Sequence, residues 1–222
     1  MRPVVFLGPS LDRESAAREL DAEYLPPVAR GDIEDLLGRA TPPRAIGIVD
    51  GRFLDSLSIS PKEVLRAVDA GIPVYGASSM GALRAVECAP FGMIGVGRIY
   101  EAYASGAVDA DDEVAIVYHP EALRAQSEPL INLRFAVEQG VERAMIEAQA
   151  ARRFLDIAKS LYFPDRTVAA VLRILRKEIG DAVTEDFADF FANHAPDTKR
   201  EDALELLARI RHRVEQPGMV AE

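Results

Sequence analysis

Two adjacent serines, Ser78 and Ser79, stand where a strand-like pattern gives way to a helix-like one. The apolar residues 71–75 lead into four small residues, and an alanine-rich stretch with helical spacing follows. The N–H groups at a helix start lack partners within the helix and attract negative charge. Ser79 therefore has three possible roles. It caps the helix, it acts as a nucleophile, or it belongs to a turn that binds phosphate or carboxylate without covalent chemistry.

The nucleophilic reading rests on the spacing around Ser79. Ala77, Ser79 and Gly81 match a nucleophile elbow, except that alanine takes the first small position. The chemistry of such an elbow is acyl transfer, which needs an oxyanion hole as well as a nucleophile. We expect the N–H groups of Met80 and Gly81 to supply that hole.

A nucleophilic serine also needs a base, and His119 is the best placed of the three histidines because it ends a predicted strand in the core. Ser79, an acid among residues 109–112 such as Asp112, and His119 follow the chain order of a hydrolase triad. The alternatives remain open. His119 beside Pro120 also fits a surface residue, and the acidic cluster 109–113 fits a solvated turn or a site for a hard cation.

Other candidate residues follow neighbouring strands of the predicted sheet. Gly8, Pro9 and Ser10 follow the first strand, and Asp50 and Gly51 follow the third. The carboxyl ends of parallel strands meet at one edge, so we expect Ser10, Asp50 and Ser79 to converge there.

Two further side chains have two possible roles each. Arg84 either reaches an anion at the start of its helix or pairs with Glu87, three residues along. Cys88 either carries a persulfide or is a small buried hydrophobic residue.

The elements that position these residues alternate between strand and helix. We predict an α/β fold, a three-layer parallel sheet with Rossmann-like alternation, followed by a helical C-terminal region. The predicted α/β core is 1–125, and residues 126–222 pack on it as helices. The predicted strands are 4–7, 23–25, 45–49, 71–75 and 113–119, and the predicted helices are 13–20, 31–37, 61–70, 144–161, 166–179 and two that begin at Thr184 and Thr198.

Composition narrows the function classes. A net charge of −10 over 222 residues argues against non-specific nucleic-acid binding. No apolar run reaches the length of a membrane span, and the single cysteine fits a reducing, cytoplasmic location. We expect neither a cofactor nor a resident metal.

Five blocks of the first 135 residues resemble the TfuA-like family. The most distinctive is Ser79-Met80-Gly81-Ala82-Leu83-Arg84-Ala85; the others are 8–10, 26–32, 48–53 and 92–97 with 111–114. The resemblance implies an accessory protein for peptide backbone thioamidation, whose partners are a YcaO-type enzyme and a ubiquitin-like sulfur carrier. The implied task is to release or channel sulfide from a thiocarboxylated carrier.

Two other functions fit the same residues. One is a non-catalytic adaptor that docks carrier and YcaO-type enzyme, and the other is a generic small-molecule hydrolase. Oligomeric state, including a homo-oligomer, stays open.

Overall fold

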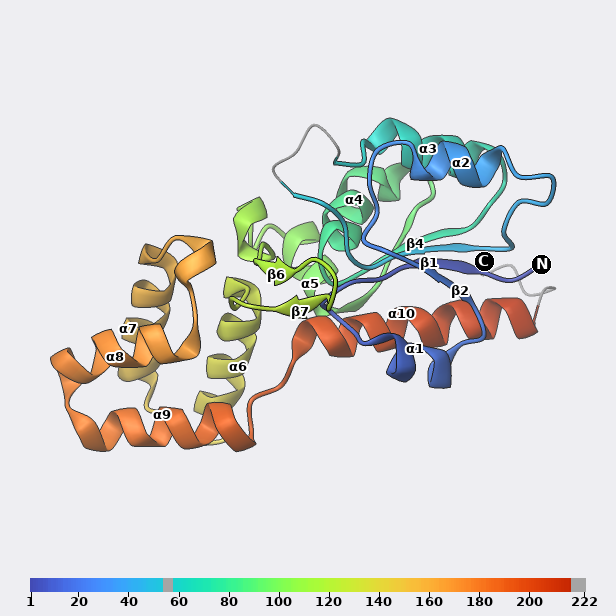
Figure 1. Ribbon diagram of the computed structural model, residues 1–222. Helices are drawn as coiled ribbons and strands as arrows, with labels where there is room; N and C mark the ends of the chain where they lie inside the picture. The colour runs from blue at the N-terminus through green and yellow to red at the C-terminus, as the bar shows by residue number, and fades with distance from the viewer. Residues whose placement is uncertain (54–57, 217–222) are drawn as a thin grey trace. The chain divides into compact units, whose positions relative to one another are not determined.

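Five short strands form a parallel sheet in a computed structural model that describes residues 1–53 and 58–216 (Figure 1). Their order across the sheet is β2-β1-β3-β4-β5. The strands are β1 (Val4–Phe6), β2 (Glu23–Leu25), β3 (Ile46–Ile48), β4 (Val74–Gly76) and β5 (Ile94–Gly95). Val4 pairs with Ile46, and Ile46 pairs with Val74, so the central strands are in register at their amino ends. The predicted α/β class is confirmed.

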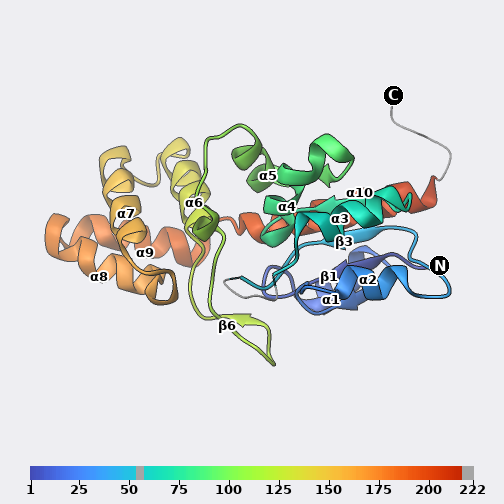
Figure 2. The same ribbon diagram turned by 90° about the horizontal axis from the view of Figure 1, so that it is seen from above.

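Successive residues of the strands pack on opposite faces of the sheet, as strand geometry requires. Phe6, Ile48 and Val74 belong to one core, together with side chains of α2 (Asp32–Leu37), α3 (Pro61–Asp69) and α4 (Met80–Cys88). These helices lie on one side of the sheet in Figures 1 and 2.

The other face of the sheet is covered by α1 (Arg13–Glu19) and α10 (Thr198–Glu215). Val5 and Tyr75 share this second core with Leu206 and Ile210 of α10. The last helix in the sequence is therefore needed to bury this face of the sheet.

The chain divides into two compact units that do not follow chain order. The first contains residues 1–109 and 199–222, and the second contains residues 110–198. The sequence-based division into an α/β core, 1–125, and a helical region, 126–222, stays a prediction.

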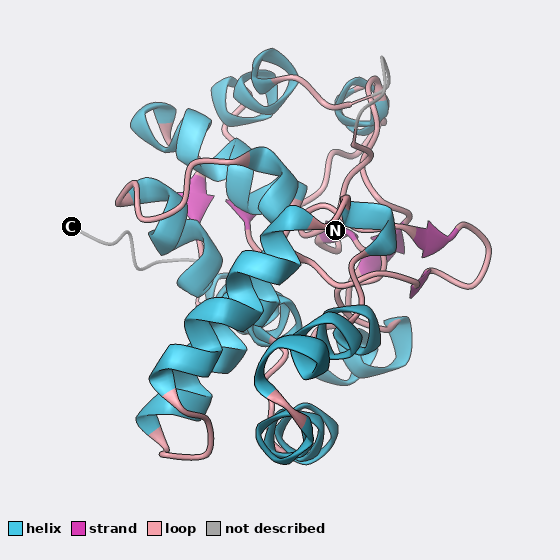
Figure 3. Cartoon of the chain, turned by 90° about the vertical axis from the view of Figure 1, so that its left-hand side faces the viewer, coloured by secondary structure: helices cyan, strands magenta, loops and turns pink. Residues whose placement is uncertain are grey.

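Helices make up most of the second unit. These are α6 (Leu130–Glu142), α7 (Ala148–Ser160), α8 (Val168–Ile179) and α9 (Asp181–Asn193), and their shared core contains Phe154, Phe187 and Phe190. Short 3₁₀ turns lie at Ala89–Phe91, Asp111–Glu113 and Phe163–Asp165. Figure 3 shows how far helix exceeds strand in this chain. None of the helices that the structure describes is long and apolar enough to cross a membrane.

The predicted strand 113–119 is wrong over most of its length. Only Tyr118–His119 forms a strand, β6, and it pairs antiparallel with β7 (Arg124–Ala125) instead of joining the parallel sheet. Val114 and Ala115 are buried outside any strand, so their apolar character reflects packing. The fifth strand is β5, in a glycine-rich stretch that the predicted strands do not include, and α5 (Gly97–Ala104) follows it.

A buried carboxylate on α10 caps α5. Asp202 is 3% exposed, and its two oxygens accept hydrogen bonds from the N–H groups of Arg98 and Ile99, both at 2.9 Å. Because the first N–H groups of a helix have no partner within it, a remote side chain here takes the place of a local cap. Burial raises the pKa of Asp202 to about 7.

Gly81 lies so close to β3 that a side chain does not fit. A Cβ there would lie 1.7 Å from the carbonyl oxygen of Ile48. We expect Gly81→Ala to lower the free energy of unfolding by at least about 3 kcal/mol in urea titrations, because a strand carbonyl must shift. Gly38→Ala is the control, since its nearest neighbour would be 3.4 Å away. Equal stability of both variants would contradict the close approach.

The raised pKa of Asp202 predicts that the free energy of unfolding falls as pH rises. The folded chain, with a pKa of about 7 here, holds a proton that the unfolded chain releases near its ordinary value of 3.8. The resulting stabilisation is complete below about pH 4 and is lost as pH rises through 7. Relative to Asp202→Asn, we expect the free energy of unfolding to fall by on the order of 2 kcal/mol between pH 5 and 7.5.

Asp69→Asn, at an exposed position on α3, is the control for the pH measurement. It should keep the pH dependence of the unchanged chain. If Asp202→Asn also keeps it, the titrating group lies elsewhere.

Candidate functional site

The carboxylate of Asp50 joins the ends of two central strands. One of its oxygens accepts from the N–H groups of Gly8 (2.8 Å) and Ser10 (3.1 Å), and the other accepts from the Ser10 hydroxyl (2.6 Å). Asp50 is 2% exposed, so these three hydrogen bonds replace water around a buried charge. The predicted convergence of the 8–10 turn with the end of β3 is thus present.

This junction lies at the switch point of the sheet. The chain runs outward from β1 to β2 on one side and then from β3 through β4 to β5 on the other. In open α/β sheets with this strand order, ligands bind outside the carboxyl ends of the strands at this point.

The next strand end is packed against the junction. A Cβ on Gly51 would lie 2.7 Å from the Met80 side chain, so Met80 sits directly on the backbone of Gly51. A Cβ on Gly8 would lie 2.6 Å from Pro27 and 3.1 Å from Asp50. Small residues are required here because the 8–10 turn, the 50–51 turn and the start of α4 touch.

The turn between β4 and α4 is strained. Ser78 has φ 64°, a left-handed conformation that costs a residue other than glycine about 1–3 kcal/mol. The N–H of Ser79 donates to the carbonyl of Ala77 at 2.8 Å, which closes a very tight turn. The Ser78 hydroxyl is fully buried and donates to the carbonyl of Lys199 at 2.6 Å, so α10 helps to hold the turn.

Ser79 precedes the first residue of α4, but its hydroxyl does not cap the helix. No hydrogen bond joins that side chain to the first turn, and its hydroxyl has no partner among residues 1–53 and 58–216. Ser79 is 4% exposed. The capping alternative is wrong for Ser79, and its hydroxyl is left unused by the described fold.

The expected oxyanion hole is reduced to one donor. The N–H of Gly81 donates to the carbonyl of Val49 at 3.3 Å, and those of Ala82 and Leu83 donate to the carbonyl of Ser79. Within the described residues, this leaves the N–H of Met80 as the first-turn donor without an acceptor.

Arg84 is engaged by structural contacts. Its Nε donates to the carbonyl of Ile59 at 2.9 Å, and its guanidinium pairs with Glu87 at 2.5 Å. The pairing alternative is confirmed. Cys88 is buried, as expected for a small hydrophobic residue. Burial raises the pKa of its thiol and so disfavours the reactive thiolate.

His119 and Asp112 belong to the second unit. His119 is exposed on β6, and its Nδ1 accepts from the N–H of Ala122 at 3.2 Å. Asp112 lies 3.7 Å from the guanidinium of Arg166. Within the first unit, the cluster of Ser10, Asp50 and Ser79 therefore contains neither residue.

The acidic cluster of the second unit binds arginines. Glu113 is buried and accepts two hydrogen bonds from Arg134, at 2.5 and 2.6 Å. Arg166 is 1% exposed, burial lowers its pKa, and one of its terminal nitrogens has no hydrogen-bond partner in the part of the chain that the structure describes. Among the residues that the structure describes, no group of three His, Cys, Asp or Glu side chains is arranged to hold a metal ion.

Sequence reasoning missed Lys199, Asp202 and Arg166. Lys199 is 3% exposed, and its carbonyl accepts a hydrogen bond from the Ser78 hydroxyl. Each lies in or beside a helical pattern where Lys, Asp and Arg are normally solvated, so the sequence carries no signal of their burial.

The strand order defines an α/β protein of the doubly wound class, with the Asp50 junction at the switch point of its sheet. Residues 50–167 match the family described as TfuA-like protein, and the chain belongs to that family. The family is associated with thioamide-forming systems of YcaO-type enzymes. The matched range includes Asp50, Ser79 and His119. A comparison with curated proteins finds no match.

The two serines should differ in their effect on stability. Ser78→Ala removes a buried hydrogen bond and should lower the free energy of unfolding by about 1–2 kcal/mol. Ser79→Ala removes a hydroxyl without a partner and should change it by less than about 0.5 kcal/mol. Urea unfolding of both variants checks this, and a larger loss for Ser79→Ala would mean that its hydroxyl supports the fold.

Proposed function

We propose that this protein releases sulfide from a thiocarboxylated, ubiquitin-like sulfur carrier for a YcaO-type enzyme that forms backbone thioamides. Ser79 is the nucleophile in this proposal. The observation that carries it is the Ser79 hydroxyl, which the described fold leaves without a partner at a strained turn on the ligand-binding edge of the sheet. Strained backbone of this kind concentrates at functional sites.

The reaction is acyl transfer to water. The Ser79 oxygen attacks the carbonyl carbon of the carrier thiocarboxylate, the C–S bond breaks, and the serine proton passes to the sulfur, which leaves as hydrosulfide, HS⁻. Water then cleaves the acyl ester, restores the Ser79 hydroxyl and leaves a carrier carboxylate and one proton. No electrons are gained or lost, so the proposal needs no redox partner.

The start of α4 supports this chemistry electrostatically. Its N-terminus carries a partial positive charge, which favours the thiocarboxylate anion and the oxyanion that forms from it. The free N–H of Met80 is the donor we assign to that oxyanion.

Asp50 acts as a positioning residue in this account. Its carboxylate accepts three hydrogen bonds and holds the 8–10 turn beside the ends of β3 and β4. Gly8, Pro9, Ser10 and Gly51 then form one wall of the pocket, with Ser78 and Gly81 shaping the turn behind Ser79.

The base is assigned to His119, which the sequence order favours. Of the three histidines in the chain, only His212 belongs to the first unit. A second candidate function, a non-catalytic adaptor whose pocket holds the carrier tail, needs no base within the first unit.

The two functions differ in what Ser79→Ala does. With a thiocarboxylated carrier as substrate, we expect the unchanged chain to release sulfide and Ser79→Ala to release at least about 100-fold less. Ser105→Ala, at an exposed serine of the same unit, is the control and should release sulfide at the unchanged rate. His119→Ala tests the assigned base by its effect on the rate and its pH profile.

Two outcomes would contradict the proposed nucleophile. If the carrier binds but neither the unchanged chain nor any variant releases sulfide, the adaptor function remains. Equal release by the unchanged chain and Ser79→Ala would remove Ser79 from the mechanism.

A further inference from the structure

The start of α10 is hydrogen-bonded to the segments that follow two neighbouring strands of the first unit. The carbonyl of Lys199 accepts from the Ser78 hydroxyl at 2.6 Å, beyond the end of β4. Asp202 accepts from the N–H groups of Arg98 and Ile99, beyond the end of β5. Residues 199–202 span about one helical turn, so both contacts belong to one rigid piece, the 199–202 turn.

The contacts of the 199–202 turn are buried and closely packed. Ser78 is fully buried and Asp202 is 3% exposed. A Cβ on Gly97 would lie 2.2 Å from the carboxyl carbon of Asp202, so this side chain sits directly on the backbone at the start of α5. Arg200 also holds the turn by pairing with Asp12 at 3.2 Å, but this pair is exposed and contributes little. The two buried contacts therefore fix the 199–202 turn.

The segment that the 199–202 turn holds is the one that carries Ser79. Ser78 has the left-handed φ of 64°, and the Lys199 carbonyl is the acceptor of its hydroxyl. A strained conformation persists only while its surroundings hold it. When the 199–202 turn moves away, the buried Ser78 hydroxyl loses its acceptor and the strained backbone relaxes, which displaces Ser79.

Asp202 is the group whose ionisation acts on the 199–202 turn. Burial raises its pKa to about 7, the backbone N–H groups that it accepts from oppose the rise, and the charges of Glu205 and Glu201 add to it. Loss of the proton leaves a buried negative charge beside two other carboxylates. An outward movement of the 199–202 turn brings that charge into water.

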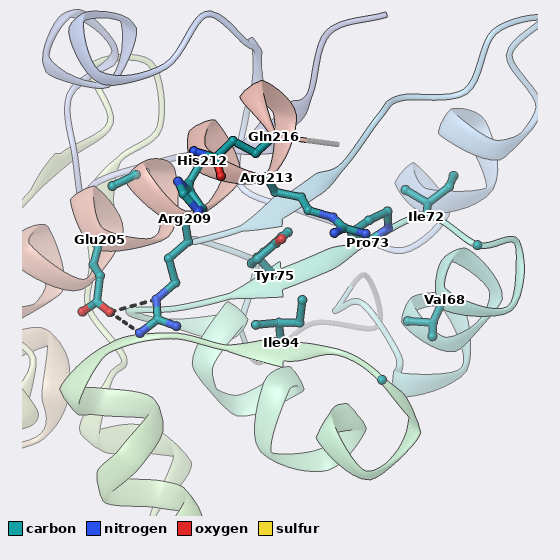
Figure 4. Close-up of a pocket in the computed structure, with 13 residues that line it drawn as sticks. Val68, Ile72, Pro73, Tyr75, Ile94, Glu205, Arg209, His212, Arg213 and Gln216 are labelled. Carbon is teal, nitrogen blue, oxygen red and sulfur yellow. Dashed lines mark hydrogen bonds and ion pairs between the residues drawn. The ribbon is translucent and has the colours of Figure 1, made fainter. Parts of the chain in front are cut away.

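Other charged residues lie along the same two helices. Glu205 pairs with Arg209 at 2.7 Å (Figure 4). The cationic residues nearest in sequence to these contacts are Lys199 on α10 and Arg98 on α5, and both have interactions of their own. The charges that act most strongly on Asp202 are those of the two glutamates, and both oppose its ionisation.

We propose that Asp202 is a positioning residue for Ser79 that acts through the Lys199–Ser78 hydrogen bond, and that loss of its proton releases the Ser79 segment. The catalytic role of Ser79 in this statement rests on the proposed function, whereas the movement of the segment does not. The proton stabilises the bonded arrangement fully at low pH, and this stabilisation is lost as pH rises through about 7. Ionisation of Asp202 therefore lowers the rate of sulfide release above neutral pH.

Hydrogen exchange of the full chain, followed by mass spectrometry, tests the release without any substrate. The amides of residues 79–83 are compared at pH 5 and pH 8 as protection factors, which correct for the intrinsic pH dependence of exchange. We expect their protection to fall at least about tenfold from pH 5 to pH 8, because the bound proton favours the bonded arrangement. Asp202→Asn should show no such fall.

Ser78→Ala separates this coupling from a general loss of stability. It removes the hydrogen bond to Lys199 and leaves Asp202 in place. Protection of residues 79–83 should then be reduced at both pH values and should no longer depend on pH. The two amides that donate to Asp202 should keep their pH dependence. This comparison also decides the case in which Asp202→Asn does not fold.

His212→Gln is the matched control on the same helix. His212 is exposed on α10 (Figure 4), and histidine is the side chain that ordinarily changes its charge between pH 5 and pH 8. The variant should keep the pH dependence of the unchanged chain at residues 79–83.

Sulfide release from a thiocarboxylated carrier is the second readout. The rate of the unchanged chain should fall at least about threefold between pH 7 and pH 8.5, and Asp202→Asn should lose this fall. If no chain releases sulfide, the proposed function fails while the exchange measurement still decides this inference.

Three results would overturn the proposal. One is equal protection of residues 79–83 at pH 5 and pH 8 in the unchanged chain. The others are a fall in protection that persists in Asp202→Asn, and a fall of the same size in Ser78→Ala.

Discussion

The hydrogen bonds of one buried carboxylate determine the shape of the candidate site. Asp50 ends the third strand, and its two oxygens hold both backbone and side chain of the turn after the first strand. Without this carboxylate, the N–H groups of Gly8 and Ser10 would be buried without partners, which a fold rarely tolerates. The same turns leave no room for side chains at Gly8, Gly51 and Gly81. The 8–10 turn, the end of β3 and the start of α4 are therefore one connected arrangement.

The last helix completes this arrangement from a distance in sequence. α10 buries one face of the sheet. The carbonyl of Lys199 accepts a hydrogen bond from the Ser78 hydroxyl, and the carboxylate of Asp202 caps α5. The Ser78 turn is strained, and such a turn persists only when its surroundings hold it. The C-terminal helix is thus part of what keeps Ser79 at the start of α4.

The sequence predicted the α/β core because its signals are local. Strand-length apolar runs alternate with helix starts, and the predicted helix 61–70 has a capping box at its start, at Ser60. The 113–119 strand failed because an apolar run of that length also fits buried irregular chain, as at Val114 and Ala115. The role of α10 was not predictable, since its amphipathic pattern does not say which surface it covers. The burial of Asp202 has the same cause: only the folded chain brings it to the start of α5.

The central claim is that Ser79 is a nucleophile, and a covalent intermediate tests it most directly. The thiocarboxylated carrier would be mixed with the protein, quenched in acid within one turnover, and analysed by intact and peptide mass spectrometry. The account predicts an ester between the carrier carboxyl end and Ser79, with a mass equal to protein plus carrier less one hydrogen sulfide, and no such species with Ser79→Ala. Sulfide release with no adduct, or with an adduct on another residue, would contradict it.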